Sequence, residues 1–292
     1  MKISRKRALK NYFFYTCLIL SSIVVIIPLF MVFFFLLQKG GSSLSLDFFF
    51  NNPKPVGEIG GGMKHAILGS FYMVGLGSLI AVPLGLVCGV YLSEFGKGKI
   101  ASLLRFTIDL LTGVPSIVVG IFAYLIFVVS MKSFSAIAGA FALSIIILPI
   151  VTRTTEEILK LIPKHVKEAG LALGLPRWKV IVFIVVKGSR SSLMTGIILA
   201  ISRAAGETAP LLFTAFGSMY LSYSPDEPMA SLPVQIYNYA ISPYDDWQKQ
   251  AWAGAFTLII IVLGLNLFAR FYFVRKDIYR SIKKLFTRQT KD

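Results

Sequence analysis

The stretch AILGSFYMVGLGSLIAVPLGLVCGVYLS, residues 66–93, contains no Asp, Glu, Lys or Arg. A helix needs about 20 mostly apolar residues to cross a lipid bilayer, so this stretch is long enough to span one. Five more stretches are similarly long and apolar: about 13–37, 107–131, 133–152, 191–222 and 250–273. The sequence therefore predicts an all-α integral membrane protein in which residues 1–292 form a single membrane domain with six transmembrane helices.

The composition excludes the soluble and disordered classes of protein. Of the 292 residues, 55% are hydrophobic and 15% are charged, whereas soluble domains average about 45–50% and about 25%. Cys17 and Cys88 both lie inside apolar stretches, which argues against a disulfide framework. His65 and His165 have no second ligand at a spacing typical of metal sites, so we expect no metal site.

The basic residues predict how the chain is oriented in the membrane. The net charge is +16, and 24 of the 30 Lys and Arg residues fall in segments 1–12, 94–109, 153–190 and 270–292. Because Lys and Arg accumulate on the cytoplasmic side, we expect both termini and the loop 153–190 to be cytoplasmic and the loop 223–249 to lie outside. Basic segments beside spans normally face anionic lipid, so the excess charge indicates membrane lipid, and no nucleic acid, as a partner.

The external loop 223–249 is rich in tyrosine, proline and acidic residues and contains Trp247. Loops of this length are usually functional or disordered, and this composition favours an ordered docking surface. The alternative is an aromatic belt at the membrane interface without a protein partner.

The cytoplasmic loop 153–190 has the pattern of two short amphipathic helices. Residues 154–157, TTEE, are typical of a helix start, because hydroxyl groups cap free N–H groups and acidic groups favour the positive end of the helix dipole. A second helix is expected over 166–173, followed by Gly174 in a left-handed cap. This pattern favours a helix–turn–helix on the inner face over a loop that only fixes the topology.

The sequence EAGLALG at 168–174, followed by Ile184, resembles the EAA loop of bacterial ABC importer permeases. In that family the loop forms coupling helices that sit in a cleft on the ATPase. The resemblance therefore implies that Glu168, Ala169, Gly170 and Gly174 couple this chain to an ATPase. Gly170 stands where the motif has its second alanine.

Two further stretches are similar to the PstA-type permeases of the high-affinity phosphate importer: AISRAAGETAP at 200–210 and VPSIVVG at 114–120. The resemblance implies the type I ABC importer permease (MetI-like) fold, in the bacterial cytoplasmic (inner) membrane. It also implies a heterodimer with a sister permease subunit, an ATP-binding ATPase dimer and an external phosphate-binding protein.

The chain contains no G-x-x-x-x-G-K-[ST] motif, which is the phosphate cradle of many ATP-binding proteins. We therefore expect a transport subunit rather than an enzyme, with no catalytic residue, no bound cofactor, and ATP used by the partner ATPase. A permease for another oxyanion, such as sulfate or molybdate, is an alternative, and a membrane-embedded enzyme is a second. The enzyme alternative requires a catalytic set within the membrane, and the sequence contains neither H-E-x-x-H nor a recognisable nucleophile–base pair.

Arg203 lies near the middle of the fifth span, and Glu207 follows it by four residues, which places both on one face of a helix. A charge at mid-membrane costs roughly 2.5–3.5 kcal/mol, so something must offset that cost. One interpretation is a substrate pathway formed by Arg203, Glu207, Thr208 and Ser202, in which the guanidinium binds the oxyanion. The other is a structural pair whose charges neutralise each other. Pro210 is expected to kink this helix.

Overall fold

A computed structural model describes residues 5–55, 58 and 60–289. Within them the regular structure is helical, as the sequence predicts. The α-helices are α1 (Arg5–Ser43), α2 (Leu46–Phe50), α3 (Lys64–Glu94), α4 (Lys99–Gly113), α5 (Ser116–Ala123), α6 (Val129–Met131), α7 (Ala136–Lys160), α8 (Lys164–Ala172), α9 (Arg177–Lys179), α10 (Arg190–Ala205), α11 (Ala209–Thr214), α12 (Leu232–Ala240) and α13 (Asp245–Gln289). Two π-helical segments, η1 (Tyr124–Val128) and η2 (Val180–Val186), continue α5 and α9.

Four of these helices, α1, α3, α7 and α13, are long and apolar enough to cross a membrane unbroken. Two further spans are bent pairs: α4 with α5–α6 at 103°, and α9–η2 with α10 at 70°. The chain therefore has six spans when each bent pair counts as one.

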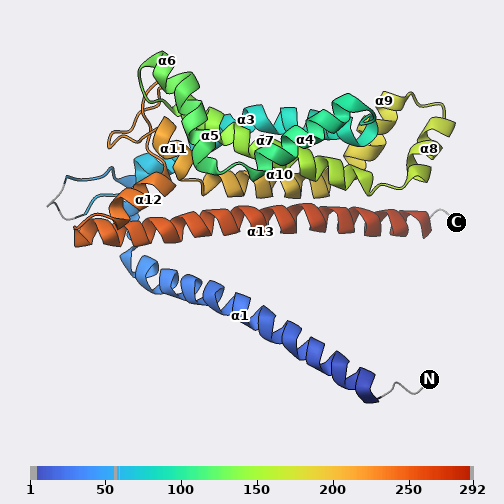
Figure 1. The fold of residues 1–292 in the computed structure, drawn as a ribbon, viewed down its shortest axis with the longest axis horizontal. Coiled ribbons are helices and arrows are strands. Elements are labelled where there is room, and N and C mark those ends of the chain that lie inside the picture. Colours follow the sequence, from blue (N-terminus) through green and yellow to red (C-terminus); the bar gives the residue numbers. More distant parts are fainter. Residues whose placement is uncertain (1–4, 56–57, 59, 290–292) are drawn as a thin grey trace.

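The third expected span, 107–131, is not a single straight helix. It breaks between Gly113 and Ser116, where Val114 has the extended conformation φ −69°, ψ 129°. Pro115 accounts for the break, because proline lacks an N–H and its ring disfavours helical geometry in the residue before it. As a result α5 turns sharply away from the direction of α4 (Figure 1).

The fifth expected span, 191–222, ends earlier than its apolar composition indicates. Helix α10 stops at Ala205 and α11 restarts the helix at Ala209, with Pro210 in its first turn. Pro210 therefore ends the helix instead of kinking it, because its ring would clash with the carbonyl of residue 206 in a continuous helix. The remainder of the expected span contains the short α11 and an irregular segment.

Helices α3 and α7 form the centre of the bundle, and their backbones approach closely. A Cβ atom on Gly77 would lie 2.7 Å from the Ala140 carbonyl oxygen, and one on Gly89 would lie 2.7 Å from the Thr152 carbonyl oxygen. Small residues permit such contact between membrane helices, where van der Waals packing replaces the hydrophobic effect. The stripe on α3 repeats every four residues: Gly77, Ala81, Gly85 and Gly89.

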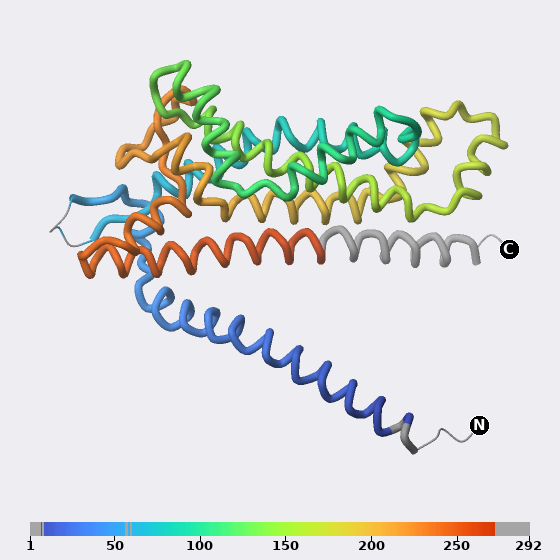
Figure 2. The backbone as a smooth tube through the Cα atoms, viewed as in Figure 1, coloured from blue at the N-terminus to red at the C-terminus, as the bar shows by residue number. Residues whose placement is uncertain are grey.

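Helix α1 packs against α13 and diverges from the rest of the bundle toward its N-terminus (Figure 2). The most apolar part of α1 is entirely exposed in this chain. An apolar helix whose surface is left largely uncovered is stable only in lipid or against another membrane protein, so most of the surroundings of α1 lie outside this chain.

Different helices lie at the two ends of the bundle. Helices α8 and α9 lie at the same end as the start of α1 and the end of α13, whereas α6, α11 and α12 lie at the other end (Figure 1). The segments expected inside the cell thus share one end of the molecule.

One sequence-based expectation about the loops is wrong. Residues 154–157 do not start a helix, because α7 continues through them to Lys160, and Thr155 and Glu156 are both 1% exposed. The second half of the loop 223–249 packs in part on the bundle, and its role as a docking surface stays a prediction. Ala230, Leu232 and Tyr239 are buried where α12 packs on α3 and α13, and α13 begins at Asp245.

Candidate functional site

A pocket of about 180 Å³ lies where four helices meet. It is lined by the end of α4, the start of α5, the middle of α7 and the end of α10, and its charged side chains are Arg203 and Glu207. The complete lining is Leu111, Thr112, Val114, Pro115, Ser116, Val119, Ile146, Pro149, Ile150, Arg203 and Glu207.

The two segments 114–120 and 200–210, far apart in sequence, touch beside this pocket. A Cβ atom on Gly120 would lie 2.7 Å from the Pro210 Cα atom and 3.3 Å from its carbonyl oxygen. Only a residue without a side chain allows this approach, since both neighbouring atoms belong to backbone. The proline breaks that end α4 and α10 therefore bring both segments to one place.

Arg203 occupies the last turn of α10, and its side chain is exposed. Glu207 lies beyond the end of that helix and is partly buried. Within the part of the chain that the structure describes, no ion pair within 4.0 Å joins the two side chains. The expected (i, i+4) arrangement is wrong because the helix ends between them, and the interpretation as a neutralising pair lacks its contact.

The start of α5 reaches the same pocket through Ser116, which lines it. The first N–H groups of a helix have no acceptor within it and carry the positive end of the helix dipole. In α5 the first of these belong to Ser116 and Ile117, since the first bonds to the Pro115 carbonyl come from the next two residues. Arg203 and the helix start together make one part of the pocket suited to an anion.

The structure places the other two expected pathway residues differently. Ser202 is 4% exposed, lies on the inner side of α10, and does not line the pocket. Thr208 is the residue before α11 and also does not line it. Thr112 and Ser116 do line it, and the sequence reasoning missed them. The signal for both was the proline at 115, which brings a helix end and a helix start together.

The expected coupling residues form a compact turn at the end of α8. Gly174 has φ +78°, which confirms the left-handed cap. The Leu175 N–H donates to the Gly170 carbonyl and the Gly174 N–H to the Leu171 carbonyl, which is the Schellman pattern. Glu168 and Ala169 are exposed.

Gly170 is the buried member of this segment and faces the following π-helical segment. A Cβ atom there would lie 2.7 Å from the Ile184 Cδ1 atom and 3.1 Å from the Val180 Cγ2 atom. Gly170, which stands where the EAA motif has its second alanine, is therefore in contact with Ile184, which matches the motif. This contact packs α8 against η2 and leaves Leu171, Leu173 and Trp178 exposed.

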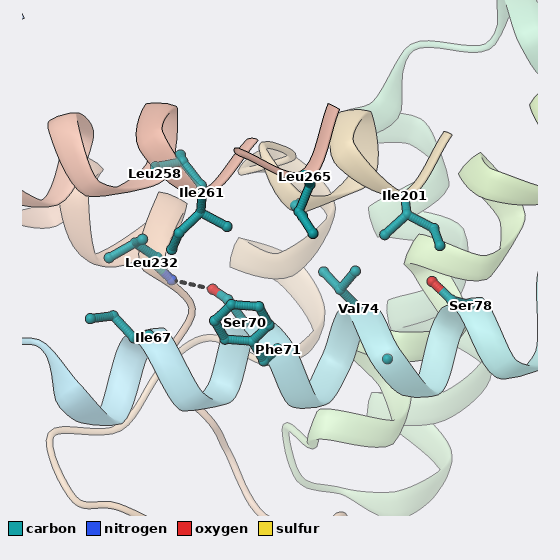
Figure 3. Close-up of a pocket in the computed structure, with 12 residues that line it drawn as sticks. Ile67, Ser70, Phe71, Val74, Ser78, Ile201, Leu232, Leu258, Ile261 and Leu265 are labelled. Atoms are coloured by element: carbon teal, nitrogen blue, oxygen red, sulfur yellow. Dashed lines mark hydrogen bonds between the residues drawn. The ribbon is translucent and has the colours of Figure 1, made fainter. Parts of the chain in front are cut away.

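A second cavity, of about 230 Å³, lies between α3, α10, α12 and α13 (Figure 3). Apart from the hydroxyl groups of Ser70 and Ser78, its walls are apolar, and the Ser70 hydroxyl already accepts the Leu232 N–H at 2.7 Å. It offers no charge to an anion, so the pocket with Arg203 is the better candidate for a site that handles a charged solute.

Comparison with known proteins shows which family the chain belongs to. Residues 81–277 match the family described as "Binding-protein-dependent transport system inner membrane component". The chain is 45% identical over 235 residues to the "Phosphate transport system permease protein PstA" of Haemophilus influenzae, covering 80% of this chain and 83% of the relative. It is 46% identical over 234 residues to the protein of the same name from Yersinia pestis, covering 80% and 79%.

Among solved structures, the chain is similar to one from an inward-facing conformation of the MetNI methionine ABC transporter. The TM-score is 0.54 with 17% sequence identity, and the match covers 76% of this chain and 94% of that chain. At this identity the likeness concerns the fold alone.

Proposed function

The chain belongs to the family of binding-protein-dependent transport system inner membrane components, as a PstA-type permease of a phosphate ABC transport system, and from this premise we propose how its residues carry phosphate. It is a multi-pass inner-membrane transport subunit and not an enzyme, and membership of the family implies an ATPase and a binding protein as partners. We propose that phosphate crosses the membrane past the pocket that contains Arg203.

The observation that carries this proposal is the unpaired state of Arg203. Among the described residues no carboxylate lies within ion-pair distance of this guanidinium, and an unpaired charge inside a membrane bundle is costly unless it faces water or a solute. The planar guanidinium offers two parallel N–H groups to two oxygens of an oxyanion. Ser116, at the start of α5, lines the same pocket, and its N–H has no acceptor within the helix.

Glu207 favours phosphate over sulfate or molybdate as the solute. Phosphate still carries a proton near neutral pH and can donate it in a hydrogen bond to a carboxylate, whereas sulfate and molybdate have none to donate. A carboxylate in the pocket therefore repels a fully deprotonated oxyanion but can accept a hydrogen bond from phosphate.

The remaining assignments concern partners and orientation. A sister permease subunit completes the pathway, an ATPase dimer binds the exposed face of α8, and an external phosphate-binding protein delivers the solute. The residues that couple this chain to the ATPase are Glu168, Ala169, Gly170 and Gly174: the first two are exposed on this face, and the two glycines shape it. Support for the orientation, with both termini in the cytoplasm, comes from the charge distribution and from the common end shared by α8, the start of α1 and the end of α13 (Figure 1).

The test is the substitution Arg203→Lys in the complete transporter, reconstituted into vesicles. Lysine keeps the charge but loses the planar pair of donors. A lost charge-assisted hydrogen bond is worth about 1.5–3 kcal/mol, so radiolabelled phosphate uptake should fall about tenfold or more at equal protein levels. Arg270→Lys, the same change at an exposed position of α13, is the control and should leave uptake unchanged. Normal uptake by Arg203→Lys would refute the role of Arg203 in the pathway.

A further inference from the structure

Arg105, on α4, joins three elements at the end of the bundle that carries α8. Its Nε atom donates to the Glu156 Oε1 atom of α7 at 2.7 Å. Its Nη2 atom donates to the carbonyl oxygens of Leu92 at 2.8 Å and Gly96 at 3.2 Å, at the end of α3 and in the following turn. A Cβ atom on Gly96 would lie 2.6 Å from that Nη2 atom and closer still to the Leu92 carbonyl oxygen, so the turn is tightly packed where the arginine reaches it.

The same turn also contacts residues 164–179, which we call the α8–α9 arm. The Lys167 Nζ atom lies 2.6 Å from the Glu94 Oε1 atom. Arg177 donates to the Glu94 carbonyl oxygen at 3.0 Å, and its guanidinium lies 4.6 Å from the centre of the Phe95 ring. The connection between α3 and α4 thus lies between the arm on one side and Arg105 on the other.

The ion pair between Arg105 and Glu156 is the same number of residues from the pocket along α4 as along α7. Thr112 follows Arg105 by seven residues on α4, and Pro149 precedes Glu156 by seven residues on α7. Both line the pocket. Seven residues of α-helix span about 10 Å, so each partner of the pair is two turns from one wall of the pocket.

We propose that Arg105 and Glu156 are positioning residues that transmit movement of the α8–α9 arm to the pocket containing Arg203. This inference rests on the proposed function. Movement of the arm displaces the α3–α4 turn through Lys167 and Arg177, and Arg105 transfers the displacement to α4 and α7 together. The pair suits this role because Glu156 is 1% exposed, and a buried, hydrogen-bonded ion pair keeps its geometry better than an exposed one.

Lys160 provides a matched control. Its Nζ atom lies 2.6 Å from the same Glu156 Oε1 atom, but both residues belong to α7. Lys160 therefore stabilises the charge of Glu156 without linking one helix to another. Removing Lys160 tests the need for charge compensation, and removing Arg105 tests the need for the link.

The experiment uses the complete complex, with the sister permease, ATPase and binding protein, in vesicles loaded with ATP. The quantity measured is phosphate taken up per ATP hydrolysed, at equal amounts of assembled complex, for Arg105→Gln and Lys160→Gln. Coupling between sites is typically worth about 5–150-fold, so Arg105→Gln should lower the ratio at least about fivefold while ATP hydrolysis continues. Lys160→Gln should keep a ratio close to that of the unaltered complex.

The inference is overturned if Arg105→Gln transports with the normal ratio, or if Lys160→Gln lowers the ratio equally. If Arg105→Gln does not assemble, the ion pair between Glu94 and Lys167 is tested instead. Glu94→Lys alone should uncouple the complex, and Glu94→Lys combined with Lys167→Glu should restore the ratio; failure to restore it overturns the inference. Absence of ATP-dependent phosphate uptake by the unaltered complex would instead contradict the proposed function.

Discussion

The shape of the turn at the end of α8 depends on a single residue, Gly174. Its φ of +78° lies in the left-handed region, and the chain reverses there through the two bonds that end α8. No atom lies within 4 Å of the place where a Cβ would stand, so the constraint is one of backbone conformation and not of space.

Gly174→Val and Gly174→Asn separate an effect of backbone conformation from an effect of side-chain size. Valine in a left-handed conformation costs on the order of 1–2 kcal/mol, enough to reshape the turn without unfolding the bundle. We expect Gly174→Val to insert normally but to lose most ATPase stimulation by the loaded binding protein. Asparagine tolerates this conformation, so Gly174→Asn should retain stimulation. Equal stimulation in both variants would contradict the account.

Sequence alone predicts features at this scale when their cause is local. The cap at Gly174 could be predicted because a glycine after a short amphipathic helix is a local signal. The placement of Arg203 relative to Glu207 could not, because it depends on where α10 ends. The burial of Glu156 was missed because its partner Arg105 lies 51 residues away in sequence.

At the scale of elements, the apolar stretches predict which segments are helical, but not where two of them bend. One bend follows Pro115, which the sequence displays, but its direction depends on packing; the other lies between Val186 and Arg190, where no proline marks it. The small-residue stripe on α3 could have been recognised from its four-residue spacing, and it would have predicted the close contact with α7.

The orientation of α8 is tested by labelling cysteines in a background without Cys17 and Cys88. Leu173, next to the end of α8, is 82% exposed, and Tyr220, at the opposite end, is 85% exposed. In intact cells a membrane-impermeant thiol reagent should label Tyr220→Cys and not Leu173→Cys. Permeabilised cells should label both. The opposite pattern in intact cells would show that the bundle is inverted.

At the scale of the whole molecule, the α8–α9 arm and the pocket with Arg203 are separate sites joined by α4 and α7. The arm has exposed apolar groups for a partner, and the pocket has the unpaired Arg203. The chain itself has no motif for ATP binding, and under the proposed function the energy of ATP hydrolysis enters at the arm and acts at the pocket. The sequence predicts both sites through their motifs, but the path between them depends on contacts distant in sequence.

The most direct test of the central claim is phosphate uptake by the complete transporter, with ATP enclosed in the vesicles and the binding protein outside. The account predicts uptake that requires ATP and persists in a large excess of sulfate or molybdate, because Glu207 can accept a hydrogen bond from phosphate but repels the deprotonated anions. Uptake that sulfate or molybdate abolishes, or that proceeds without ATP, would contradict it.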